Sequence, residues 1–115
     1  MPKLGAMLSS TEIATVVDNA NTSITLALTD AGDYIRCTAS SAVTITVPLQ
    51  SSVAWLADTE IYIEQNGTGQ VTIAGASGVT VNSSQTLKTA SRYSVIALKR
   101  VASDVWTLLG DRQAA

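Results

Sequence analysis

Apolar and polar positions alternate along the chain from residue 23 onward. In residues 23–28 (SITLAL), Ile24, Leu26 and Leu28 fall on one face of an extended chain, and residues 43–48 (VTITVP) alternate in the same way. This period of two predicts β-strands that are buried on one face. Other strand-like runs occupy residues 34–38, 60–65, 70–75, 79–83, 86–89, 92–100 and 105–111, and residues 51–56 are a candidate for a short edge piece.

Turn-forming segments separate these runs at intervals of roughly 8–12 residues. One of them, NGTG at residues 66–69, predicts a hairpin between the runs on either side of it. The long apolar run at residues 92–100 predicts a central strand. The whole pattern predicts an all-β fold, namely an antiparallel β-sandwich or barrel-like domain of about 8–10 short strands.

Residues 1–22 break the alternation and are expected to form an N-terminal arm ahead of the β-domain at residues 23–111. The last residues, 112–115, are expected to fray. Ser9 and Glu12 have the spacing of a capping box and favour a short helix near residues 10–17, but an extended arm fits equally well. The arm holds apolar side chains that either contact a partner or pack inside their own domain: Leu4, Met7, Leu8, Ile13, Val16 and Val17.

The stretch GQVTIAGASGVTVNSS at residues 69–84 contains Gly69, Gly75 and Gly78. A phosphate-binding loop leads from a strand into the N-terminus of a helix. The residues after Gly78 are strand-like instead, and no lysine follows the glycines. The glycines are therefore predicted to form corners of β-structure, where each supplies a positive φ or a tight bend.

Composition excludes several classes of function. The 115 residues suggest one domain, and with a net charge of −2 and 14% charged residues the chain lacks the clustered Lys and Arg that nucleic acids or anionic membranes require. The chain has no histidine, which removes Ser-His-Asp and Cys-His catalysis and most zinc sites. Cys37 is the only cysteine, so no intrachain disulfide can form, and we expect it to be a small buried residue.

Two pairs of carboxylates are spaced closely enough along the chain to be candidate sites. Asp30 and Asp33 provide too few oxygen ligands for a calcium loop and predict a turn. Glu60 and Glu64 fall on one strand face about 13 Å apart, farther than the carboxyl pair of a glycosidase, and predict a polar sheet face. No catalytic, cofactor-binding or metal-binding residue is therefore assigned.

Four segments together resemble a β-rich module of tailed-bacteriophage structural proteins. They are LTDAGDYIRCT, VTITVP, IYIEQNGTGQVTIAGASGVTVNSS and YSVIALKRVASDVWTLLGD, in this order within residues 24–111. The module is found at fibre ends and in small capsid-associated proteins. The resemblance implies a virion component without enzymatic activity or cofactor, commonly a homotrimer, made in the host cytoplasm and located on the capsid surface or the tail.

The short chain, without a heptad pattern, favours a capsid decoration (cement) protein that bridges capsid subunits through its arm and edge strands. Its partner would be the major capsid protein or another virion protein, and neither nucleic acid nor membrane is expected. The alternative is a tail-fibre or receptor-binding component that recognises a host-surface ligand through loops 39–42, 48–59 and 83–91. An enzyme acting on cell-wall glycan is disfavoured by the missing histidine and acid pair.

Overall fold

The protein is described here from a computed structural model, over residues 14–115. The regular structure of this part of the chain consists of β-strands and one 3-10 turn, η2 (Leu28–Asp30). The strands are β1 (Val16–Asn19), β2 (Ser23–Thr25), β3 (Tyr34–Cys37), β4 (Val43–Val47), β5 (Glu60–Gln65), β6 (Val71–Gly75), β7 (Thr80–Asn82), β8 (Val95–Ala102) and β9 (Val105–Gly110).

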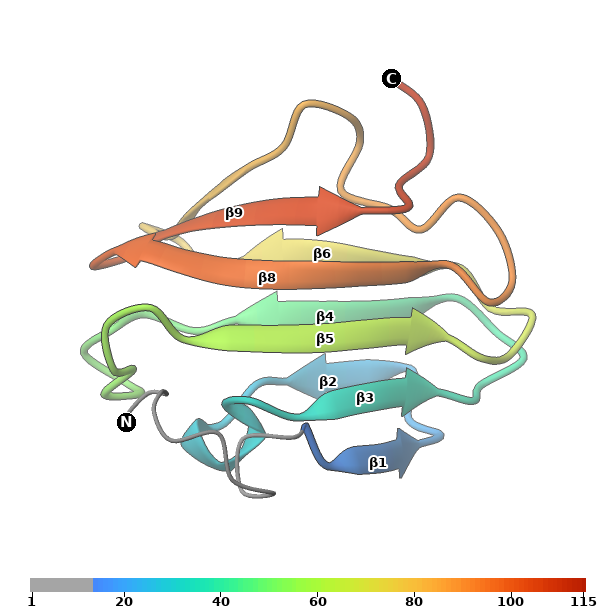
Figure 1. The fold of residues 1–115 in the computed structure, drawn as a ribbon, viewed down its shortest axis with the longest axis horizontal. Coiled ribbons are helices and arrows are strands. Elements are labelled where there is room, and N and C mark those ends of the chain that lie inside the picture. The colour runs from blue at the N-terminus through green and yellow to red at the C-terminus, as the bar shows by residue number, and fades with distance from the viewer. Residues whose placement is uncertain (1–13) are drawn as a thin grey trace.

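The strands form two layers, as Figure 1 shows. A six-stranded sheet A has the order β1-β3-β5-β8-β9-β7, and a three-stranded sheet B has the order β2-β4-β6. From β1 to β6 the chain alternates between the sheets, so each pair of strands makes one rung of a solenoid-like stack. Neighbouring rungs pair in parallel: β1 with β3 and β3 with β5 in sheet A, and β2 with β4 and β4 with β6 in sheet B.

The core lies between the two sheets and is built from columns of aliphatic side chains. Because neighbouring rungs pair in register, Ile24, Ile45 and Ile73 stack on the inner face of sheet B. Ile35 and Ile63 stack in the same way on sheet A, and β8 continues this column with a further buried isoleucine. Parallel strands enclosed in this way bury β-branched residues efficiently, which explains how a chain without phenylalanine builds its core.

The connections between the sheets stack on one another as the strands do. Residues 66–70 lie on residues 38–42, and the Gly69 amide donates to the Ala39 carbonyl at 3.1 Å. A Cβ at Gly69 would lie 1.9 Å from the Ser41 carbonyl oxygen, so only glycine fits there. Gly78 has φ +97° and bends the chain between β6 and β7. The prediction that glycines form corners of β-structure is confirmed for Gly69 and Gly78, whereas Gly75 is the last residue of β6 and pairs with Val47.

The last third of the chain covers the end of the stack opposite to β1 and β2. Strand β8 lies between β5 and β9 and pairs antiparallel with both, as expected of a central strand. On sheet B, residues 87–89 pair with β6, through Ile73 N–H to Leu87 C=O (2.8 Å) and Thr89 N–H to Val71 C=O (3.0 Å). The outer edge of β6 is therefore not open.

The expectation of an all-β fold is confirmed, but the antiparallel sandwich or barrel is wrong in its strand pairing. Alternation of apolar and polar residues is the same in parallel and antiparallel sheets, so it could not reveal the parallel rungs. The hairpin predicted at NGTG is also wrong, because β5 and β6 belong to different sheets. Residues 51–56 and 86–89 form no named strand.

Both ends of the predicted β-domain differ from expectation. Strand β1 pairs with β3 inside sheet A, although its residues had been assigned to the arm. Residues 1–13, which include most of the predicted arm, lie outside the described part. The tail predicted to fray is held, since the Gln113 amide donates to the Lys88 carbonyl at 2.8 Å and the Arg112 guanidinium donates to Ser83 Oγ at 2.9 Å.

Candidate interaction surfaces

The first candidate surface is the end of the stack formed by β1 and β2. Within residues 14–115, no strand pairs with the outer edge of either one. Both sheets therefore end together at the lower end of the stack in Figure 1. We call this surface the open end. It contrasts with the opposite end, where residues 87–89 cover sheet B.

Backbone geometry indicates which groups point out of the open end. In a parallel pair, alternate residues bond to the same neighbouring strand. Thr15 and Asn19 give their carbonyls to β3, so the N–H and C=O groups of Val16 and Asp18 point away from the sheet. On β2, Thr22 gives its carbonyl to Thr44 of β4, which leaves the corresponding groups at residues 23 and 25 pointing outward.

The core columns also end at this surface. Ile24 is 7% exposed, whereas its stacked partners are at most 1% exposed. Val17, which continues the column of Ile35, is 37% exposed. Among residues 14–115, the open end thus combines main-chain groups that pair with no strand and the exposed side chain of Val17, the two features by which an edge accepts an additional strand.

The second candidate surface is the outer face of sheet A. Strand register places five side chains in one row across five strands, in the order Val16, Tyr34, Tyr62, Ala97 and Leu109. Val16 is 59% and Leu109 46% exposed, and the three between them are half-buried by their neighbours. We call this row the tyrosine stripe. Exposed apolar rows rimmed by polar residues are typical of interaction sites.

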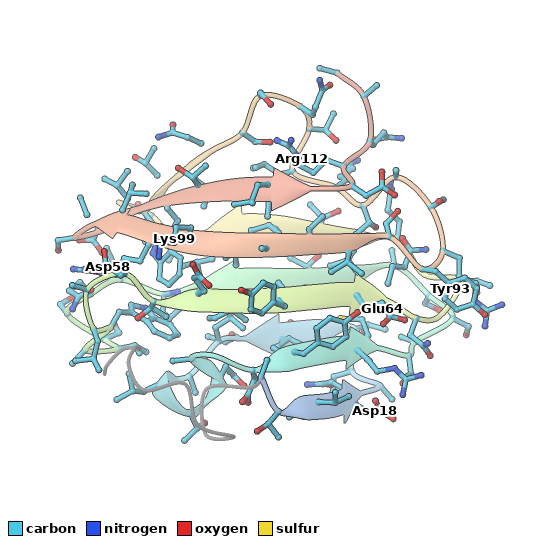
Figure 2. The ribbon with its side chains drawn as sticks, viewed as in Figure 1. Asp18, Asp58, Glu64, Tyr93, Lys99 and Arg112 are labelled. Atoms are coloured by element: carbon cyan, nitrogen blue, oxygen red, sulfur yellow. The ribbon has the colours of Figure 1, made fainter. Side chains whose placement is uncertain are left out.

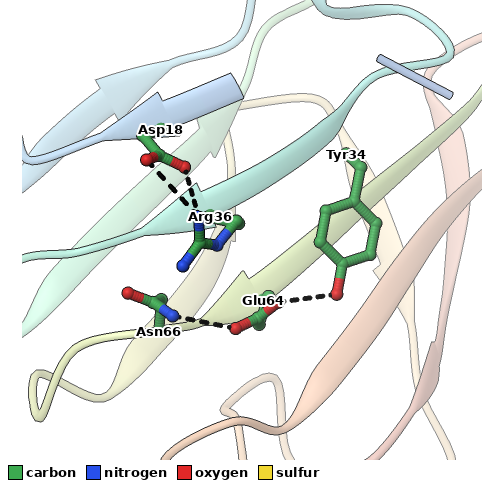
Figure 3. A network of polar contacts seen from close by, with 5 residues as sticks. All are labelled: Asp18, Tyr34, Arg36, Glu64 and Asn66. Carbon is green, nitrogen blue, oxygen red and sulfur yellow. Dashed lines mark hydrogen bonds and ion pairs between the residues drawn. The ribbon is translucent and has the colours of Figure 1, made fainter. Parts of the chain in front are cut away.

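One rim of the stripe is a hydrogen-bonded network, drawn in Figure 3. The Tyr34 hydroxyl donates to Glu64 Oε1 at 2.7 Å, and Asn66 Nδ2 donates to Glu64 Oε2 at 3.1 Å. These hydrogen bonds hold the pKa of Glu64 below its ordinary value, while burial and the bond to Glu64 raise the pKa of Tyr34 to about 12. Arg36 Nη1 pairs with Asp18 Oδ1 at 3.2 Å.

The other rim joins Glu60, Tyr62 and Lys99. Glu60 accepts from the Tyr62 hydroxyl at 2.8 Å and from Lys99 Nζ at 3.0 Å, and these two contacts lower the pKa of Glu60. Lys99 also donates to the Asp58 carbonyl. Figure 2 shows Lys99 and Glu64 toward opposite ends of the strands of sheet A.

A shallow depression lies in the stripe above the small side chain of Ala97. It has a volume of about 280 Å³ and is bordered by Glu60, Tyr62, Lys99 and Leu109. Because alanine stands between a tyrosine and a leucine in the row, the hollow is a direct result of side-chain size. It can accept one bulky side chain from a partner.

Of the residues predicted to contact a partner, Leu4, Met7, Leu8 and Ile13 lie outside the described residues. Val16 and Val17 are both on β1, where Val16 begins the tyrosine stripe and Val17 ends a core column. Sequence reasoning placed Glu60, Tyr62 and Glu64 on a polar sheet face, and this is confirmed. It did not find the stripe, because only strand pairing brings its residues together.

The residues considered for chemistry are held in structural roles. Cys37 is fully buried in β3, as expected, and burial raises the pKa of its thiol to about 11. Asp30 accepts the Ala27 amide at 2.7 Å within the predicted turn. Among residues 14–115, no three His, Cys, Asp or Glu side chains lie close enough to hold a metal ion. The same part of the chain contains no helix of the length and hydrophobicity needed to cross a membrane.

Comparison with protein-family models, with curated proteins and with solved structures finds no match to this chain. Its function is therefore inferred from the residues and from the two surfaces.

Proposed function

We propose that this protein is a non-enzymatic structural component of a bacteriophage virion, and specifically a capsid decoration protein that bridges capsid subunits. The class of protein rests on the sequence resemblance. The open end is the observation that supports binding by strand addition, because within residues 14–115 no strand pairs with the outer edges of β1 and β2, beside Val17 and Ile24.

Binding by strand addition gives the protein a way to stabilise a shell. An extended segment of a capsid subunit would pair with β1 or β2 through main-chain hydrogen bonds, and its apolar side chains would cover Val17 and Ile24. If such segments are presented only by the assembled shell, binding favours the shell over free subunits by mass action. Residues 1–13 would add apolar contacts with the same partner. The homotrimer implied by the resemblance stays a prediction.

Proline substitution at the open end tests this proposal. Proline removes an N–H, and Asp18 and Ser23 point theirs outward, so Asp18→Pro and Ser23→Pro should fold normally. The controls Asp18→Ala and Ser23→Ala remove the same side chains and keep the N–H. We expect the proline variants to bind particles lacking the protein at least tenfold more weakly than the alanine variants. Equal binding, or density for this chain only on the tail in electron cryomicroscopy of virions, would reject the proposal.

One observation favours the alternative, a tail-fibre or receptor-binding component. Leu56, in the loop 48–59, is 75% exposed and is the most exposed large apolar residue of the described part. The loop is anchored, since Gln50 donates to the Trp55 carbonyl at 2.9 Å, so Leu56 is displayed on a fixed support. If this alternative holds, Leu56→Asp will reduce adsorption of particles to host cells without releasing the protein from the particle.

A further inference from the structure

We propose that the tyrosine stripe packs against the same stripe of a second copy, related by a two-fold axis parallel to the strands. This inference goes beyond the proposed function and does not depend on it. It uses side chains on the outer face of sheet A, and shares only β1 with the strand edges that would bind a capsid subunit.

The polar groups of the stripe are suited to burial against protein. Both tyrosine hydroxyls already donate to carboxylates, Tyr34 to Glu64 and Tyr62 to Glu60, and Lys99 is held by Glu60. Burying polar groups costs little when their hydrogen bonds are already made within the chain. A sugar would instead require free donors and acceptors, which these residues have largely used on one another.

Side-chain size makes the stripe complementary to itself. Tyr62 is the third of the five residues, so a two-fold axis at Tyr62 reverses the order of the row. Tyr34 of one copy then faces Ala97 of the other and enters the depression of about 280 Å³ above it. At the ends of the row, Val16 faces Leu109, and both are exposed in the single chain. Each of these contacts occurs twice, and Tyr62 on the axis faces itself, as in any isologous interface.

Charge permits the same arrangement. Arg36 and Glu64 are register partners on neighbouring strands of one rim. The axis at Tyr62 places Glu64 of one copy opposite Glu64 of the other, and Arg36 of each copy lies diagonally across from the other copy's Glu64, so the two arginines flank the two glutamates. The two arginines offset the repulsion between the facing glutamates, and the two copies of Lys99 lie in the same way beside the facing Glu60 pair.

The area indicates the affinity to expect. Five strands at about 4.8 Å spacing and five residues at about 3.3 Å give a face of roughly 400 Å² per copy. Counting the relief of the side chains, the two faces together reach only the lower limit of specific interfaces, about 1,200 Å². We therefore expect a dimer that dissociates in the micromolar range. Flat sheet faces pack well in pairs and only at their margins around a three-fold axis, so the stripe favours two copies.

A size swap at the central contact tests the inference. Tyr34→Ala leaves the depression empty and Ala97→Tyr fills it, so each single variant should weaken dimerisation tenfold or more. In the double variant Tyr34→Ala/Ala97→Tyr, the tyrosine faces the new alanine again, and the dissociation constant should return to within about threefold of the unsubstituted protein. Thr44→Tyr, on the exposed outer face of β4, is the control for adding a tyrosine to a sheet.

Sedimentation equilibrium of the full chain between 1 and 500 µM is the measurement, with circular dichroism to verify that each variant is folded. A monomer throughout this range would overturn the inference, as would a double variant no tighter than the single ones. A mass of three copies would overturn the two-fold arrangement and agree with the number implied by the resemblance. Ser23→Pro, on β2 of the other sheet, should leave dimerisation unchanged, so this inference and the proposed function can fail separately.

Discussion

Replacement of Gly69 by alanine tests whether the stacked connections between the sheets determine stability. The Gly69 φ is accessible to any residue, so the substitution adds a steric conflict without a backbone penalty. The new Cβ would lie 1.9 Å from the Ser41 carbonyl oxygen and 2.5 Å from its carbon. Both are main-chain atoms, so the conflict cannot be relieved by a side-chain rotation.

The stability lost in Gly69→Ala follows from how far the two connections must move apart. The two connections must separate by more than 1 Å to bring the closest contact to 3.0 Å, which threatens the hydrogen bonds from Gly69 to Ala39 and from Val43 to Gln70. Each bond contributes about 1 kcal/mol, and the adjoining start of the β4–β6 pairing is disturbed as well. We expect a loss of about 3 kcal/mol or more in the free energy of unfolding.

Gly32→Ala is the matched control. Gly32 has φ +79°, and a Cβ there would meet no atom within 4 Å. Gly32→Ala should therefore lower the free energy of unfolding only by the cost of a left-handed backbone conformation at alanine, about 1 kcal/mol. Urea unfolding monitored by circular dichroism measures both variants, and thermal unfolding should show Gly69→Ala lower in Tm than Gly32→Ala by very roughly 10 °C. Equal stability of the two variants would refute the close stacking of the connections.

Three further outcomes follow from burial and from the titrating groups. Ile63→Ala should lower the free energy of unfolding by about 2–5 kcal/mol, because Ile63 is fully buried, whereas Val95→Ala on the outer face should cost much less; similar losses would contradict the assigned core. The hydrogen bond from Tyr34 lowers the folded-state pKa of Glu64. The ionised Glu64 therefore contributes its full share of folding stability at pH values well above its ordinary pKa of 4.5, and this share is lost as the pH falls through the folded-state pKa. The Tm of Glu64→Gln should therefore decline less than that of the unsubstituted protein between pH 6 and pH 3, and parallel curves would rule this out. Cys37, buried and with its pKa raised to about 11, should react with a thiol reagent at pH 8 only on unfolding, so rapid labelling of the native protein would count against its placement.

A repeat in the sequence could have revealed the parallel stack. Tyr34-Ile35 is followed after seven residues by Val43-Thr44-Ile45, and the same letters recur, with the same spacing, 28 residues later at 62–63 and 71–73. The structure pairs these segments residue for residue. Internal repeats are the usual sign of stacked rungs. The NGTG turn instead predicts a local hairpin. Four adjacent residues are enough to indicate a turn, but they do not indicate which strands pair.

The sequence by itself determined the β class, the inward side of the central strands, the burial of Cys37 and the role of the glycines as corners. Each of these depends on residues within a few positions of one another, through alternation, chain flexibility and side-chain size. The tertiary structure alone decided which strands are neighbours, and so created the open end and the tyrosine stripe. Val16, Tyr34, Tyr62, Ala97 and Leu109 span 94 positions of the chain and meet only through register. Main-chain groups at a strand edge can hydrogen-bond to any other strand. The packing of side chains in the whole core therefore selects which strands pair and in which register.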